Sequence, residues 1–342
     1  MTLNDIKDSL KEDRYSFLRT NEHLGSNIIF LTLGGSYAYG TNVETSDVDI
    51  RGCALERSSD LIGLSSFDQV VNTETDTTIY GFNKLIQLLL SCNPNTIEML
   101  GCKPEHYLYL SDIGRELIDN RKLFLSQRAV NSFGGYATQQ LRRLENALAR
   151  DRLPQSKKED HLCGALERAI SDFNHLYKEF DQGTISLYTE DSRFSAFEKE
   201  VVCDIHIDHF PVRSFGIMLN TFSNVIRSYE KLTHRNNKKD DAHLNKHAMH
   251  LIRLYMMCID ILEEEEIKTY RENDREFLLS IRNGAFQNKD GTYRKEFFEL
   301  VDDYEKKLTY AKQNTSLPLS PNMDRIEEFV MSVNRRSLYE SN

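Results

Sequence analysis

The sequence contains no apolar run that approaches the roughly twenty residues needed to cross a membrane. Its first residues, 1–19, mix Asp, Glu and Lys with apolar residues and lack the hydrophobic segment of a signal peptide. The six cysteines are scattered and form no Cys-x-x-Cys pair, which argues against both a disulfide framework and a zinc site. We therefore expect a cytoplasmic protein with reduced thiols and no membrane contact.

Basic residues are fewer than acidic ones, with 43 Lys and Arg against 53 Asp and Glu and a formal net charge of −10. A broad nucleic-acid-coating surface gains its affinity from many phosphate contacts, so this balance argues against one. It remains compatible with a local basic channel. The acidic balance suits a small nucleotide substrate, or a protein or RNA end held at one site.

No internal repeat and no low-complexity segment interrupts the chain. Its 342 residues, of which 39% are hydrophobic and 28% charged, suit a globular protein of two domains. The pair Gly34-Gly35 lacks the Lys-Ser/Thr that a Walker phosphate loop requires after it, so that class of nucleotide site is excluded here.

The most informative stretch, residues 28–52, has the composition of a strand, a turn and a second strand. The apolar run at 28–31 is typical of a buried strand. It ends at Gly34-Gly35-Ser36, where glycine permits a sharp turn or a close approach to a ligand.

Acidic and apolar residues alternate in Asp47-Val48-Asp49-Ile50 at the end of this stretch. In a strand, this alternation places Asp47 and Asp49 on one face and the two apolar side chains in the core. Two carboxylates on one exposed face repel each other and favour a cation between them. Mg²⁺, which takes one or two carboxylates together with substrate phosphates, suits such a site, and Mn²⁺ is the alternative metal.

Together, Gly35-Ser36, Gly40-Thr41 and Asp47-x-Asp49 resemble the signature of the DNA polymerase β-like nucleotidyltransferase superfamily in order and spacing. A lone Asp-x-Asp is more often a solvated acidic strand, whereas the whole combination is specific. The resemblance implies a catalytic domain of a mixed sheet with helices, an NTP substrate, and metal ions bound by the two acids. Backbone amides near Gly35 and the hydroxyl of Ser36 are expected to hold the β and γ phosphates.

The same resemblance implies a third metal-binding carboxylate on a later strand, which commonly serves as the base toward the attacking hydroxyl. Residues 67–79 are rich in Val, Thr and Ile, and we expect them to form one polar strand. Asp76 lies where this strand would return beside the acid pair, and we assign the third carboxylate to it. Glu74 shares its face under strict alternation and is the alternative.

A second pattern combines a helix at 81–91, the turn Asn93-Pro94-Asn95 and a short helix at 96–100. It resembles the RlaP-type predicted nucleotidyltransferases of bacteria and phages, which are named for their association with RNA ligases. Residues 280–284 and 317–321 add two shorter resemblances. An Asn-Pro-Asn turn occurs in many proteins, so this pattern carries weight only beside the acid motif. It implies an RNA end, in a repair pathway, as the acceptor.

From about residue 111 onward the sequence predicts mostly helix. We therefore expect an α+β protein with a nucleotidyltransferase catalytic domain at 1–125 and a helical domain at 126–342 that closes the nucleotide cleft. The polar, proline-bearing segment 151–160 is predicted to be a link.

The helix predicted over 240–262 carries Lys246, His250 and Arg253 at i, i+4 and i+7, and hence on one face. Such groups suit a polyphosphate, which arginine binds through two hydrogen bonds. A solvated helix face is the alternative, but the stripe also resembles the Lys…His…Arg helix of RlaP-type proteins. A zinc site of His243, His247 and His250 lacks a completing ligand, so we prefer a structural or phosphate-contacting role for these histidines.

These patterns predict an enzyme that transfers an NMP from an NTP, such as ATP, to an acceptor hydroxyl and releases pyrophosphate. RNA, protein and small-molecule acceptors stay open, as do the nucleotide preference and the oligomeric state. Oligonucleotide and cyclic-nucleotide signal synthases share the motif spacing and are the main enzymatic alternative. A non-catalytic antitoxin or adaptor with the same fold is the alternative from another class, and the presence of both Asp47 and Asp49 argues against it.

Overall fold

The computed structural model describes residues 2–152, 155–176, 183–193, 198–234, 241–289 and 291–340. The chain forms two compact units, one of residues 1–140 with 248–342 and one of residues 141–247. The sequence analysis had divided the chain at residue 125 instead. The difference arises because the C-terminal residues, 248–342, return to pack with the N-terminal sheet.

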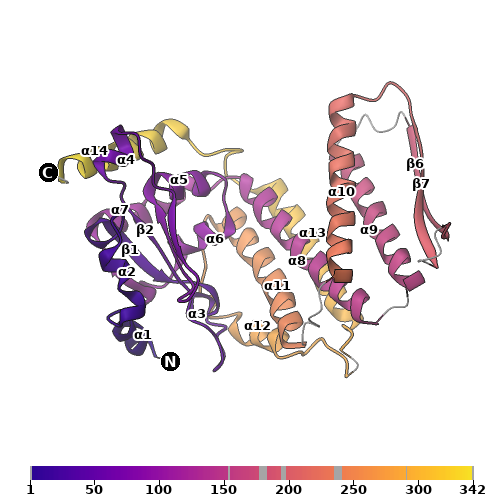
Figure 1. Ribbon diagram of the computed structural model, residues 1–342, viewed down its shortest axis with the longest axis horizontal. Coiled ribbons are helices and arrows are strands. Elements are labelled where there is room, and N and C mark those ends of the chain that lie inside the picture. Colours follow the sequence, from indigo (N-terminus) through magenta and orange to yellow (C-terminus); the bar gives the residue numbers. More distant parts are fainter. Residues whose placement is uncertain are drawn as a thin grey trace. The chain divides into compact units, whose positions relative to one another are not determined.

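A five-stranded mixed sheet in the order β3-β4-β2-β1-β5 belongs to the first unit. Figure 1 shows this sheet among the helices of the unit. Strands β2 and β4 run parallel, and the other neighbours pair antiparallel. Strand β1 is buried at every position, as its apolar run predicts. The strands are β1 (Ile28–Leu33), β2 (Ile50–Ala54), β3 (Gln69–Asn72), β4 (Thr77–Gly81) and β5 (Tyr107–Leu110).

Helices surround this sheet and make up most of the remaining chain, which confirms the predicted α+β class. One face of the sheet packs against Tyr15 and Leu18 from the N-terminal segment, which contact a cluster containing Ile50 and Ile79. The helices of this unit are α1 (Leu3–Ser9), α2 (Phe17–Thr20), α3 (Gly35–Tyr39), α4 (Ser58–Ile62), α5 (Phe82–Leu90), α6 (Pro94–Ile97), α7 (Asp112–Asp119), α12 (Arg275–Arg282), α13 (Lys295–Asn314) and α14 (Met323–Glu340).

The Asn-Pro-Asn turn starts a helix as well as ending one. The side chain of Asn93 accepts a hydrogen bond of 3.0 Å from the amide of Asn95, and Pro94 occupies the first position of α6. Proline is favoured there because that position needs no amide hydrogen.

A hairpin, β3–β4, occupies the region where the sequence analysis predicted one strand over 67–79, so that prediction was wrong. The side-chain oxygen of Asn72 accepts hydrogen bonds of 3.0 Å from the amides of Glu74 and Thr75. This Asx turn interrupts a run that is otherwise rich in strand-forming residues. Glu74 and Asp76 therefore lie in a turn, and strict alternation does not relate them.

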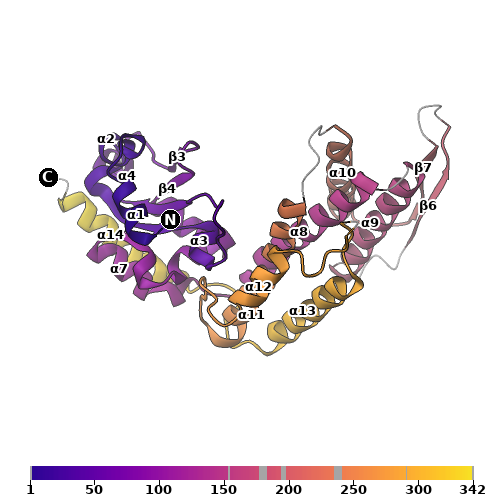
Figure 2. The same cartoon turned by 90° about the horizontal axis from the view of Figure 1, so that it is seen from below.

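The second unit contains a two-stranded hairpin, β6–β7, and helices α9 and α10. Figures 1 and 2 show the hairpin beside α9, which also contacts α10. Its elements are α9 (Gln155–Leu176), β6 (Gly183–Asp191), β7 (Lys199–Ile207) and α10 (Val212–His234), and two helices shared between the units, α8 (Arg128–Arg152) and α11 (Asp241–Glu264), lead into and out of it.

The link predicted over 151–160 is largely helical, so this prediction was wrong as well. Helix α8 continues to Arg152, and α9 begins at Gln155. Lys157 and Asp160 form an ion pair of 3.2 Å one turn apart, which supports a helix without hydrophobic periodicity. Among the residues that the structure describes, no helix is both long and apolar enough to span a bilayer.

Candidate active site

Asp49 and Asp76 lie at the same end of two neighbouring parallel strands. Asp49 immediately precedes β2, Asp76 immediately precedes β4, and the first residues of these strands, Ile50 and Thr77, are paired. The amide of Ile50 also donates a hydrogen bond of 3.1 Å to the carbonyl oxygen of Asp76. The structure thus places Asp76 beside Asp49, as the sequence analysis expected, although the chain reaches that position through a turn.

The glycine bend lies directly against the carboxylate of Asp49. A Cβ atom placed on Gly35 would meet Oδ2 of Asp49 at 1.9 Å, and the φ angle of Gly35 is +52°. Both the space and the backbone conformation therefore require glycine. The amide of Gly34 donates a 2.8 Å hydrogen bond to the carbonyl oxygen of Asp49, so the backbone also joins the bend to the acid. Ser36 follows within α3 and is buried.

Asp47 has a different environment from Asp49. Its side chain is exposed, whereas Val48 packs against two core clusters and Ile50 is fully buried. The sequence analysis expected residues 47–50 to lie in a strand, but β2 begins only at Ile50, so Asp47 and Asp49 precede it. The described part of the chain contains no group of three or more His, Cys, Asp or Glu side chains placed to hold a metal ion. Asp47, Asp49 and Asp76 are therefore not assembled as a three-carboxylate cluster.

Arg51 lies between the two carboxylates that the strands bring together. Its Nη2 is 3.2 Å from Oδ1 of Asp49 and 3.1 Å from Oδ1 of Asp76. Its Nη1 donates hydrogen bonds to the carbonyl oxygens of Ile50, at 3.0 Å, and Asp76, at 2.6 Å. The sequence analysis missed this residue, although Arg51 follows Asp49 by only two positions.

The donors at this position suit a hard divalent cation. They are carboxylate oxygens, the ligands that Mg²⁺ prefers, and the side chains of Asp49 and Asp76 are 20% and 57% exposed, so both are accessible from solvent. The guanidinium group of Arg51 already lies against both of them. The space between these acids therefore attracts positive charge.

The comparisons with known proteins identify one family. Residues 10–162 match the family model described as RlaP, the RNA repair pathway DNA polymerase beta family. This segment matches an RlaP-type, polymerase β-like domain. Neither the curated proteins nor the solved structures contain a match to the chain. The matched segment includes the whole sheet, Gly35 and the three predicted acids, and it is consistent with a nucleotidyltransferase in the general sense.

Two C-terminal arginines hold the loop that joins the bend to the acid motif of the RlaP-type domain. Arg275 donates a hydrogen bond of 2.7 Å from Nε to the carbonyl oxygen of Gly40. Arg282 donates from Nη1 to the carbonyl oxygen of Thr41 and from Nη2, at 3.2 Å, to the hydroxyl of Ser46. Arg282 lies within residues 280–284, where the sequence analysis noted a shorter resemblance; the family match does not extend to this segment.

Arg253 does not have the environment expected of a polyphosphate ligand. Its side chain is fully buried, forms an ion pair of 3.2 Å with Glu98, and lies over the ring of Tyr39 at 3.5 Å. Tyr39 in turn donates a 2.7 Å hydrogen bond to Glu98. Burial raises the pKa of Tyr39 well above its ordinary value, so the hydroxyl stays protonated as a donor. The predicted phosphate role is corrected here, because a buried carboxylate already engages the guanidinium group.

The other two residues of the predicted stripe have separate environments. His250 is half-buried, and its Nδ1 lies 3.1 Å from Nη2 of Arg253, so it belongs to the same buried cluster. Lys246 is exposed and belongs to the unit of residues 141–247. Helical spacing predicted that the three residues share one face of α11. In the structure Lys246 is exposed, whereas Arg253 is buried.

Proposed function

We propose that the RlaP-type domain transfers an NMP from an NTP to an acceptor hydroxyl and releases pyrophosphate. The observation that carries this proposal is the meeting of Asp49 and Asp76 at one end of β2 and β4, with Gly35 against the carboxylate of Asp49. A carboxylate pair facing a glycine bend fits the arrangement that metal-assisted phosphoryl chemistry needs.

Asp49 and Asp76 would hold Mg²⁺ or Mn²⁺, whereas Asp47, which is not clustered with them, stays a metal ligand predicted from the sequence alone. The bound ions would stabilise negative charge on the attacking and leaving oxygens of an in-line displacement. The acceptor oxygen forms a bond to the α-phosphorus while the bond from that phosphorus to the pyrophosphate oxygen breaks. Asp76, whose side chain is 57% exposed, accepts the proton of the attacking hydroxyl. Glu74, in the same turn, stays the alternative base.

The triphosphate would lie over the Gly34–Ser36 bend, where the missing side chains allow close approach to the backbone. The hydroxyl of Ser36 and nearby amides remain our proposed contacts to the β and γ phosphates. Arg253 and its neighbour His250 are not retained as phosphate contacts, and Lys246, which is exposed in the unit of residues 141–247, stays a prediction from the sequence alone.

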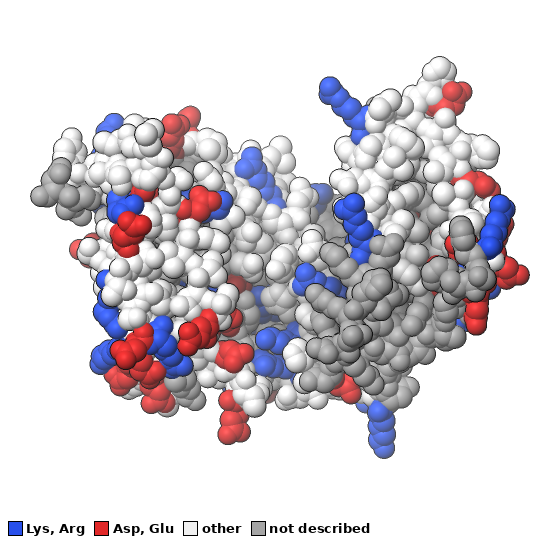
Figure 3. Space-filling view, in the orientation of Figure 1, with Lys and Arg blue, Asp and Glu red and all other residues white. Residues whose placement is uncertain are grey.

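We propose an RNA end as the acceptor, because the family description names an RNA repair pathway. On the face shown in Figure 3, acidic and basic side chains are interspersed. Such a surface suits a nucleic-acid end bound at one place better than a long duplex bound along its backbone.

The test is transfer of label from each α-labelled NTP, in Mg²⁺ or Mn²⁺, to RNA ends, to protein and to no added acceptor. Asp49→Asn and Asp76→Asn should each lower transfer by about 1,000-fold, since the metal supplies several kcal/mol of charge stabilisation. Asp68→Asn is the matched control, because Asp68 is exposed and pairs only with Lys84 among the ion pairs described.

Label found on RNA and lost in the Asp49 variant supports the proposal. If the label is found on protein, or in a new oligonucleotide or cyclic nucleotide, the acceptor is that molecule and not an RNA end. No transfer under any of these conditions, together with a co-purifying partner protein, would instead indicate a non-catalytic adaptor.

A further inference from the structure

We propose that Arg51 is a positioning residue that acts as an internal cation: it holds Asp49 and Asp76 together before a divalent ion arrives and yields its contact with them when the ion binds. The proposal rests on the proposed function for the identity of that ion. It adds that the positive charge of Arg51 competes with the divalent ion for the two carboxylates, and that this competition sets the affinity of the site for metal.

The first argument is that pairing of β2 with β4 forces two negative charges together. Asp49 and Asp76 precede paired residues, and both carboxylates lie within 3.2 Å of the same nitrogen atom of Arg51. Like charges held this close repel each other unless a cation lies between them. Arg51 supplies that cation from the second residue of β2.

The second argument is that the guanidinium group is fixed from two sides. Nη1 donates to the carbonyl oxygens of Ile50 and Asp76, and Nη2 donates to the two carboxylates. The side chain of Arg51 is 23% exposed. A small rotation about the Nη1 anchor therefore releases the two carboxylates, and the arginine need not leave the strand.

The third argument concerns what the acids do without help from Arg51. Asp47 is exposed and is not clustered with the other two acids, so a third carboxylate does not pre-organise the site. A divalent ion must therefore compete with Arg51 for both of its main ligands. Removing the arginine should tighten metal binding and destabilise the metal-free protein at the same time.

The experiment measures Mn²⁺ binding by titration, with the free ion followed by electron paramagnetic resonance, and thermal unfolding with and without Mn²⁺. Arg51→Gln should lower the dissociation constant by about tenfold or more, because the ion no longer displaces two ion pairs. The same variant should have a lower Tm without Mn²⁺ and a larger rise in Tm on adding it. Arg51→Lys, whose single ammonium cannot make all four contacts, should fall between the two.

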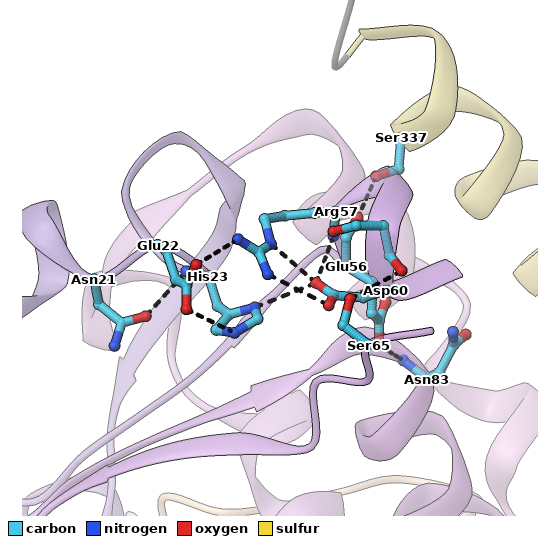
Figure 4. A network of polar contacts seen from close by, with 10 residues as sticks. Asn21, Glu22, His23, Glu56, Arg57, Asp60, Ser65, Asn83 and Ser337 are labelled. Atoms are coloured by element: carbon cyan, nitrogen blue, oxygen red, sulfur yellow. Dashed lines mark hydrogen bonds and ion pairs between the residues drawn. The ribbon is translucent and has the colours of Figure 1, made fainter. Parts of the chain in front are cut away.

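Arg57 provides a matched control within the same domain. Like Arg51 it bridges two acids, with Nη1 at 2.7 Å from Glu22 and Nε at 3.1 Å from Asp60, in the network of Figure 4. Arg57→Gln should lower Tm, and its dissociation constant for Mn²⁺ should equal that of the unchanged protein.

Three results would overturn the inference. If Arg51→Gln binds Mn²⁺ as tightly as the unchanged protein or more weakly, Arg51 does not compete with the ion. If Arg51→Gln fails to fold, an Mn²⁺ affinity of Arg51→Lys equal to that of the unchanged protein leads to the same conclusion. Tighter binding in Arg57→Gln as well would show a general charge effect. If either of these two results is found and the protein still transfers NMP, the inference about Arg51 is wrong while the proposed function stands. Absence of Mn²⁺ binding in every variant removes the metal-dependent function and this inference together.

Discussion

At the scale of single residues, Glu56 is a buried carboxylic acid that lies beyond the end of β2 opposite to Asp49. It is 4% exposed, and its Oε1 accepts a hydrogen bond of 2.8 Å from the amide of Asn83. Its carbonyl oxygen accepts another, of 2.9 Å, from the hydroxyl of Ser337 (Figure 4). Burial raises the pKa of Glu56 from 4.5 to about 7, because the charged form loses its hydration.

This pKa makes stability depend on pH in a direction that is unusual for a carboxylic acid. Between pH 4.5 and about 7 the folded protein binds more protons at Glu56 than the unfolded chain does. Its contribution is therefore complete below pH 4.5 and is lost as the pH rises through about 7. Glu56→Gln should remove up to about 3 kcal/mol of this pH dependence. Urea unfolding of the unchanged protein and of Glu56→Gln at several pH values measures this difference. If the free energy of unfolding changes with pH in the same way in both proteins, the prediction is wrong.

Gly35 allows a second prediction at the same scale. Gly35→Ala would place a methyl group on the carboxylate of Asp49 and force alanine into a left-handed conformation. We expect a loss of about 1–3 kcal/mol in unfolding free energy together with loss of NMP transfer and weaker Mn²⁺ binding. Gly135→Ala is the control, because nothing lies within 4 Å of its added methyl group and α8 gains helix propensity. Similar effects of both substitutions would argue against the close contact.

At the scale of elements, α12 holds the loop of residues 40–46 in place. Arg282 contacts Thr41 and Ser46, which lie between the glycine bend and Asp47, and Arg275 contacts Gly40. The side chain of Arg282 is partly buried, and this burial lowers its pKa below the ordinary arginine value. The position of Asp47 thus depends on a helix more than two hundred residues away along the chain.

Arg282→Ala should loosen this loop more than it destabilises the fold. Loss of bonds to a charged donor costs about 1.5–3 kcal/mol, and we expect faster amide exchange at 41–47 than in the unchanged protein. Hydrogen exchange followed by mass spectrometry measures this effect, with Arg325→Ala, an exposed arginine at the start of α14, as the control. Unchanged exchange at 41–47 in Arg282→Ala would show that the loop holds its shape without α12.

The same elements show which parts of the site are predictable from sequence. The buried strand β1, helix α5 and the alternation around Val48 follow local periodicity, and the sequence analysis identified them. The Asx turn at Asn72 is also local, but the surrounding strand-forming residues obscured its signal. Arg282 and Thr41 are separated by 241 positions in the sequence, and Arg253 and Glu98 by 155 positions. Local sequence patterns could not predict hydrogen bonds between residues so far apart.

At the scale of the whole molecule, the first unit is built from both ends of the chain. Several contacts join residues 248–342 to the N-terminal part of this unit. Arg253 forms an ion pair with Glu98, Arg282 donates hydrogen bonds to the loop of residues 40–46, and Ser337 donates one to the carbonyl oxygen of Glu56. Each of these contacts reaches a buried or half-buried group of the N-terminal sheet region. The N-terminal residues 1–125, which the sequence analysis proposed as the catalytic domain, would expose all of those groups if they stood alone.

Truncation tests this dependence. A chain ending at Glu264 loses α12, α13 and α14, and we expect it to unfold without cooperativity and to bind hydrophobic dye, because buried partners of the sheet are removed with those helices. A chain ending at Leu338 is the control, since it keeps Ser337 and removes Tyr339, which is 81% exposed. Circular dichroism melts of the two proteins distinguish these outcomes. Cooperative melting of the shorter chain would mean that the sheet and its N-terminal helices fold without α12, α13 and α14.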